Sequence, residues 1–324
     1  MRSNISAICL ASFSVGIVFL NLMSFYMTSA DSLLLFYTFL LFLLLVPNLK
    51  ALKESPVWLF KQNRFKEGIQ VLQEIAEINS RSVATEEYLK ALEDHTQKDA
   101  LEKIGTEEDS SPGLVDKIKL IWNESEHLKA LIILSSVCSA LYIVYYGIAS
   151  SVQDLGFDKI QYNGIATGIT QGLGFLFVYP YLNSTPRKFA MLCIQGFLGL
   201  CGGVLFLLSM FPTWSLIRFF EGLIANVLIS CVISSLFSFS YLANTESFPP
   251  QIRGICVGII LLVGKILGSM APLISHTCKD LGIHVLAGCS VPMVFSFMLT
   301  LGFKETLSTL KSPEPNMSKT SSEA

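Results

Sequence analysis

The residue with the clearest capacity for chemistry is Lys265, which lies within a long apolar stretch of the chain. A polar hairpin that carries Glu246 and Arg253 precedes this stretch, and Lys265 is its one charged residue before Leu273. A charged side chain inside a membrane-length helix is costly, so it is treated as a functional-site hypothesis. Lys265 lies eight residues before Leu273. At that depth its ammonium group needs a water-filled cavity, a carboxylate or an anionic substrate.

No acidic residue stands at a matching depth in another apolar stretch, and Glu221 lies near the end of its own. An unpaired central lysine therefore favours a polar cavity that attracts anions. In the alternative interpretation, the long side chain of Lys265 reaches the membrane surface or a backbone carbonyl and takes no part in function.

A second polar group of interest is the amide of Gln171, which lies in an apolar stretch rich in glycine. Small residues at helical spacing let transmembrane helices approach closely, so packing is the first explanation of the glycines. An amide at mid-membrane depth needs a hydrogen-bonding partner, either another helix or a substrate. The serines between Ser230 and Ser240 likewise either line a cavity or bond to their own helix backbone.

Apolar runs close to the thickness of a bilayer core recur along the whole chain. A transmembrane helix needs about 20 apolar residues, and 52% of the 324 residues are hydrophobic. The sequence therefore predicts an all-α polytopic membrane protein with about eight transmembrane helices. The expected spans are residues 5–28, 31–48, 128–151, 161–183, 188–210, 214–241, 253–275 and 284–303.

Lysine and arginine residues in the connections determine the predicted orientation. If the spans alternate in direction, one side receives most of these residues, namely Arg2, Lys50, Lys53, Lys61, Arg64, Lys66, Arg187, Lys188, Arg253 and Lys304. The opposite side has only Lys159 and Lys279 in its connections. Because positive residues concentrate on the cytoplasmic side, both termini and the connection 49–127 are expected in the cytoplasm.

Two segments outside the spans complete the predicted organisation. Residues 49–127 are expected to form a cytoplasmic helical linker between the two helices in 1–48 and the six in 128–304. Within the linker, apolar residues recur at helical spacing from Phe65 to Ile78, and two further helical segments are expected over 84–104 and 114–122. The polar tail over 305–324 is expected to be disordered.

Composition and motifs argue against several other classes of protein. The formal net charge of −2 gives no support for a nucleic-acid partner. The eight cysteines form no CxxC pair, so neither a zinc site nor a disulfide framework is expected. The chain lacks a phosphate-binding glycine loop, a His-x-x-His pattern and a nucleophile elbow, so we expect no enzyme activity and no cofactor.

Several segments, taken in order, resemble the organic ion transporter family of the major facilitator superfamily. The Glu-Ser-Pro-Val-Trp-Leu run that starts at Glu54 is similar to the signature after the family's sixth helix. The Glu-Ser-Phe-Pro run at Glu246, followed by Ile252 and Arg253, resembles the family's Glu-Leu-Tyr-Pro element. Further similarities cover Tyr145–Gly147 in the seventh helix, Asn183–Lys188 in a gate loop, Gly264–Gly268 in the eleventh helix and Glu305–Thr306 after the last.

This resemblance implies transport of a small organic ion by alternating access, without ATP hydrolysis. In the family, the position that matches Lys265 is often basic in anion transporters, so the resemblance favours an anionic substrate. It also places Tyr145 and Tyr146 near the substrate path, where Gln171 would supply a hydrogen bond. Ordinary helix packing is the alternative explanation of the two tyrosines.

The resemblance further implies a gate at the cytoplasmic face, formed by Glu246, Arg253, Arg187 and Lys188. Two positions of the gate loop depart from the family pattern, because Asn183 and Pro186 replace an aspartate and a glycine. The replaced aspartate is an acidic partner expected to hold the inward gate closed. Gln171 also stands where the family often has glutamate, which leaves proton or charge coupling there open.

The family has twelve spans, and this chain resembles it from the fifth onward. The first two spans would be the last pair of the N-terminal half, and the other six a complete C-terminal half with two inverted repeats. If the protein is complete as it stands, a partner chain is expected to close the cavity. A non-transporting remnant or accessory subunit is then an alternative function. A sugar-type facilitator has the same fold, but the charge of Lys265 counts against it.

Overall fold

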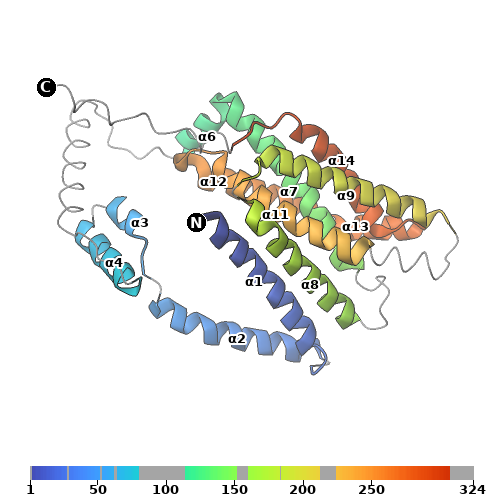
Figure 1. Cartoon of the computed structure of the whole chain (residues 1–324), viewed down its shortest axis with the longest axis horizontal. Helices are drawn as coiled ribbons and strands as arrows, with labels where there is room; N and C mark the ends of the chain where they lie inside the picture. Colours follow the sequence, from blue (N-terminus) through green and yellow to red (C-terminus); the bar gives the residue numbers. More distant parts are fainter. Residues whose placement is uncertain are drawn as a thin grey trace. The chain divides into compact units, whose positions relative to one another are not determined.

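The computed structural model of the protein describes residues 2–27, 29–51, 53–61, 64–79, 114–151, 160–182, 184–211 and 224–306. These ranges contain helices and no β-strand (Figure 1), which confirms the prediction of an all-α membrane bundle. The helix expected over 84–104 and the tail beyond residue 306 lie outside the described residues.

The helices coincide with the predicted spans. Six of these spans each match one helix: α1 (Arg2–Met23), α2 (Ala30–Ala51), α7 (Ser125–Ser151), α8 (Ile160–Val178), α9 (Arg187–Ser209) and α14 (Val285–Thr300). The sixth predicted span is described only in its second part, as the π-helix η3 (Ile224–Ile229) and α11 (Ser230–Glu246). Arg218 and Glu221 lie outside the described residues.

Length and hydropathy single out the helices best suited to crossing a membrane. Within the described ranges, four helices are long and apolar enough: Ala30–Leu49, Ser125–Ser150, Arg187–Ser209 and Ile252–Asp280. Two shorter apolar helices cover Ile8–Met23 and Val285–Thr300. The protein is therefore an integral membrane protein.

The seventh predicted span is divided into two helices, which the sequence analysis did not anticipate. α12 covers Pro250–Gly268, and α13 covers Ala271–Asp280. Pro272 favours the division, because proline has no backbone N–H to donate to the carbonyl of Gly268 and its ring clashes there. The chain therefore turns between Gly268 and Ala271 and then continues as a second helix.

α7 lies at the centre of the bundle and packs against α11, α12, α13 and α14. Its buried face includes Leu134, Leu141 and Ile148, which recur every seven residues. Glycines of α12 let that helix approach closely, since a β-carbon on Gly264 would lie 2.9 Å from the Tyr142 ring. This packing fixes the position of the tyrosine-bearing face of α7.

α1 packs along α8, and the two helices run side by side in Figure 1. A β-carbon on Gly164 would collide with the Asn21 side chain, and one on Gly168 would lie 2.8 Å from Val18. The absence of side chains at these two glycines of α8 therefore lets the two backbones approach closely.

The contacts divide the chain into two compact units, Met1–Tyr26 with Leu114–Ala324 and, separately, Met27–Gly113. The first unit also contains α6 (Leu114–Asn123), and the second contains α2, α3 (Pro56–Lys61) and α4 (Phe65–Ile78). α4 confirms the helix predicted from the spacing of Phe65 to Ile78, and it packs against α3 with Gly68 facing the Phe60 ring. The sequence-based boundaries at residues 48, 127 and 304 stay a prediction.

Candidate functional site

A cavity of about 250 Å³ lies between α1, α7, α8 and α11. None of the described residues that line it carries a charge. Its lining is mostly aromatic and apolar: Leu10, Phe13, Tyr142, Tyr145, Tyr146, Gln171, Phe175, Ile233, Ser234 and Phe237. A largely apolar cavity with a few polar groups is the usual form of a small-molecule site.

The aromatic rings of this cavity support one another edge to face. The ring of Phe237 lies 5.6 Å from that of Tyr145 at an interplanar angle of 89°, and 5.6 Å from that of Tyr142 at 81°. Tyr145 and Tyr146 are 5.5 Å apart at 65°, and Phe13 of α1 lies 6.4 Å from Tyr145. Edge-to-face pairs hold aromatic side chains in defined orientations, so the wall of the cavity is preformed.

The cavity has one polar side chain, the amide of Gln171, that is both buried and available to a ligand. Gln171 is only 3% exposed, and its amide has no hydrogen-bonding partner among the described residues. The hydroxyl of Ser234, in contrast, donates to the carbonyl of Ser230 at 3.0 Å. Gln171 is therefore the polar group that a bound molecule would satisfy.

The structure brings together three of the four residues proposed from the sequence as substrate contacts: Tyr145, Tyr146 and Gln171. Sequence reasoning did not propose Phe13, Phe175 or Phe237 for the cavity. Phe237 could have been found, because it stands three residues after Ser234 and so shares its helix face.

Lys265 is not among the residues that line the cavity. It is exposed on α12 and forms no ion pair with a described residue. Its neighbours Gly264 and Gly268 pack against Tyr142 and Tyr146, so the lysine stands on the helix that supports the aromatic wall. Its role in binding substrate stays a prediction.

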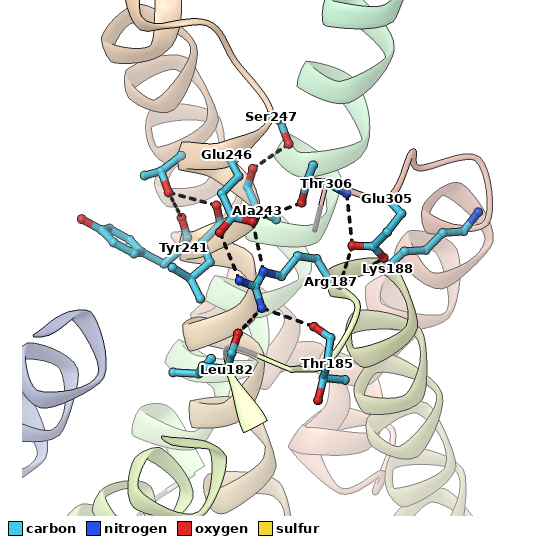
Figure 2. A network of polar contacts seen from close by, with 12 residues as sticks. Leu182, Thr185, Arg187, Lys188, Tyr241, Ala243, Glu246, Ser247, Glu305 and Thr306 are labelled. Atoms are coloured by element: carbon cyan, nitrogen blue, oxygen red, sulfur yellow. Dashed lines mark hydrogen bonds and ion pairs between the residues drawn. The ribbon is translucent and has the colours of Figure 1, made fainter. Parts of the chain in front are cut away.

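A second set of polar residues forms a latch, defined here as Arg187, Glu246, Glu305 and Thr306. Arg187 Nε donates to Glu246 Oε2 at 3.0 Å, and Nη2 donates to Oε1 at 3.1 Å. Figure 2 shows the guanidinium between Glu246 and the carbonyls of Leu182 and Thr185, to which Nη1 donates. The Arg187 side chain is only 3% exposed and that of Glu246 15%.

Glu305 joins the segment after α14 to the start of α9. Its carboxylate accepts from the backbone N–H of Arg187 at 2.8 Å and of Lys188 at 3.0 Å. The Thr306 hydroxyl donates to Glu246 Oε2 at 3.2 Å. A carboxylate at a helix N-terminus is favoured by the helix dipole and by the free N–H groups there. The latch therefore ties together the start of α9, the end of α11 and the segment after α14 (Figure 2).

Of the four gate residues proposed from the sequence, three take part in the latch and one does not. Arg187 and Glu246 form the centre of the latch, and Lys188 takes part through its backbone N–H. Arg253 does not join them, because its Nε donates to the carbonyl of Phe248 at 3.1 Å. The sequence motifs matched Glu305 and Thr306 to the family only as residues after the last helix. Their contacts in the latch were not predicted from the sequence.

A second cavity, of about 350 Å³, borders the latch. The start of α7, the end of α11 and the segment after α14 line it, with Glu246, Glu305 and Thr306 on its wall. Among the described residues, no group of three or more histidine, cysteine, aspartate or glutamate side chains could hold a metal ion.

Comparison with known proteins agrees with this architecture. A family model described as Major Facilitator Superfamily matches residues 2–272. Solute carrier family 22 member 4 of Mus musculus is 26% identical over 262 residues, which are 80% of this chain and 43% of that protein. Solute carrier family 22 member 13 of Homo sapiens is 24% identical over 302 residues, 90% of this chain and 48% of that protein.

The Carcinine transporter of Drosophila melanogaster is 24% identical over 245 residues, 76% of this chain and 34% of that protein. The chain thus spans about half the length of these relatives or less. The relatives confirm the similarity to organic ion transporters that the sequence motifs indicated. Because the family model covers most of the chain and the helices form the corresponding bundle, the chain belongs to the Major Facilitator Superfamily.

Proposed function

We propose that this chain takes part in the transport of a small organic ion across the plasma membrane, by alternating access and without ATP hydrolysis. The observation that carries the proposal is the aromatic cavity between α1, α7, α8 and α11, with the buried amide of Gln171 as its unsatisfied polar group. Tyr145 and Tyr146 would contact the flat or apolar part of the substrate. Gln171 would hydrogen-bond to a polar group of the same molecule.

We propose an anion as the substrate, because Lys265 is the one charge within its apolar stretch. The lysine follows Gly264, which packs against the Tyr142 ring of the aromatic wall, and its positive charge would attract an anion. A cation is the competing case, since aromatic rings bind cations on their faces. Uptake of matched anionic and cationic compounds separates the two.

The latch would act as the cytoplasmic gate. It ties α9, α11 and the end of α14 together, so it stabilises the state in which these ends are close. Alternating access needs a second state in which the ends separate, and the free energy of the latch would set the balance between them. The distribution of lysine and arginine supports a cytoplasmic position for this face and for both termini.

The test is uptake by cells that express the full chain, with surface expression measured in parallel. Lys265→Ala is expected to abolish saturable uptake of organic anions, while Lys279→Ala, a charge change outside the proposed path, leaves it intact. Unchanged anion uptake in Lys265→Ala would contradict the role of the lysine. Good surface expression without uptake of any organic ion would instead favour the accessory subunit and its partner chain.

A further inference from the structure

The loop that leads into α9 carries a threonine hydroxyl next to the latch. Thr185 is partly buried, and Ser184 and Pro186 on either side of it are exposed. Its carbonyl accepts from Arg187 Nη1 at 3.3 Å, while its hydroxyl has no hydrogen-bonding partner among the described residues. This hydroxyl is therefore free to react, within two residues of the latch arginine.

The residues after Thr185 form a recognisable context for enzymatic modification. Thr185 is followed by Pro186, Arg187 and Lys188. A proline directly after the acceptor, with basic residues after it, is the context that proline-directed protein kinases select. Pro186 also precedes the first helical residue of α9 and holds an extended backbone at φ −56° and ψ 133°, so the loop is not part of a helix that a kinase would have to unwind.

We propose that Thr185 is a phosphorylation site and that its phosphate releases the latch. The proposal rests on the cytoplasmic placement of this loop, which belongs to the proposed function. In the reaction, the Thr185 oxygen forms a bond to the γ-phosphorus of ATP held by the kinase. The bond from that phosphorus to the β-phosphate oxygen breaks, ADP leaves, and the hydroxyl proton passes to the catalytic base of the kinase.

Competition for Arg187 is the first reason for release. The guanidinium already makes four hydrogen bonds, two to Glu246 and one each to the carbonyls of Leu182 and Thr185. A phosphate carries a charge of about −1.5 to −2 and three strong acceptor oxygens. It would draw the same N–H groups away from the singly charged Glu246 carboxylate.

The start of α9 provides the second reason. Its N–H groups at Arg187 and Lys188 already bind an anion, the Glu305 carboxylate, at 2.8 Å and 3.0 Å. A phosphate on the residue just before the N-cap would favour the same positive end of the helix. Repulsion between the phosphate and Glu305 would then separate the segment after α14 from α9.

The experiment uses the full chain in lipid nanodiscs, treated with a proline-directed kinase and ATP, and the chain isolated from cells with phosphatases inhibited. We expect mass spectrometry to find phosphate on Thr185 in both samples. We also expect the amides of Arg187 and Lys188, and those of residues 303–306, to exchange hydrogen about tenfold faster after phosphorylation. Ser184→Ala should keep both results and Thr185→Ala should lose both, while Thr185→Ser should restore them.

Three outcomes would overturn the proposal. These are the absence of phosphate on Thr185 in both samples, an unchanged exchange rate in the phosphorylated chain, and a glycan on Asn183 in the Asn183–Thr185 sequon. A glycan would place the loop outside the cytoplasm. The first two outcomes leave the transport proposal intact, because neither measurement depends on uptake. A glycan on Asn183 would also overturn the cytoplasmic placement in the proposed function, and uptake measured separately would still test transport itself.

Discussion

The guanidinium of Arg187 and the carboxylate of Glu246 form a two-point ion pair, although 59 positions separate them in the chain. The pair joins the first residue of α9 to the last residue of α11. Its parallel N–H···O bonds, at 3.0 Å and 3.1 Å, are the geometry in which arginine binds carboxylates most strongly. Both side chains are largely shielded from water, so removal of either partner would leave the other charge uncompensated.

Removal of Arg187 is expected to destabilise the protein strongly. Arg187→Ala leaves Glu246 with a shielded, uncompensated charge, and such a change costs about 3–5 kcal/mol. The measurement is thermal unfolding in detergent, followed by a thiol-reactive dye that reports exposure of the buried cysteines Cys256 and Cys289.

The matched control for this arginine is Arg64, which pairs with Glu67 on the surface of α4 at 2.6 Å. The side chains of Arg64 and Glu67 are each about half exposed, so Arg64→Ala should leave the unfolding temperature nearly unchanged. In a double-mutant cycle, Glu246→Ala should cause little further loss once Arg187 is alanine. Additive losses would show that the two residues do not act as a pair.

Glu305 is expected to act as a cap of α9 rather than as a surface charge. Glu305→Ala removes the acceptor of two backbone N–H groups, and loss of such a cap costs about 1 kcal/mol. Glu305→Gln keeps an acceptor oxygen but loses the charge, so it should retain part of the stability. A Glu305→Gln variant with the unfolding temperature of the unmodified protein would contradict a charge-assisted cap, because the amide oxygen alone would then suffice.

Gln171 is expected to be dispensable for folding and necessary for transport. Gln171→Leu keeps a similar volume and removes a buried amide without a partner, so the unfolding temperature should stay the same or rise. Saturable uptake should fall in the same variant. A clear loss of stability would identify Gln171 as a packing residue and contradict its proposed role.

Gln195 provides the control for that substitution, because its Nε2 donates to Ser296 Oγ at 2.9 Å between α9 and α14. Both residues are fully buried. Gln195→Leu leaves the serine without this partner, but it also removes the buried Gln195 Oε1, which has no partner among the described residues. The expected loss of stability is therefore at most about 1 kcal/mol.

Features that depend on a local sequence pattern, such as the transmembrane spans, could be predicted from the sequence. Features that depend on contacts between distant residues, such as the latch, could be predicted only in part. The spans follow from apolar runs, whereas the division of the seventh could not be predicted from Pro272 alone, because Pro47 and Pro292 lie inside the continuous helices α2 and α14. Gln171 stood out because polar groups are rare in such runs, and Tyr145 and Tyr146 stood out through the resemblance to the transporter family. Glu305 did not, since its bond to the Arg187 N–H joins positions 118 residues apart. The exposure of Lys265 likewise depends on which faces of α12 other helices cover.

Two glycines of α12 allow a final prediction, because one lies at a helix–helix contact and the other does not. A β-carbon on Gly264 would lie 2.9 Å from Tyr142 and 3.2 Å from the β-carbon of Cys138, whereas one on Gly258 would meet nothing within 4 Å. Gly264→Ala should therefore push α12 away from α7, lower stability by about 1–3 kcal/mol and weaken substrate affinity by displacing the Tyr142 ring. Gly258→Ala should instead raise stability by about 0.5–1 kcal/mol, because alanine is the better helix former. Thermal unfolding and the KM for uptake of both variants test this contrast, and equal effects would show that α12 does not determine the position of the aromatic wall.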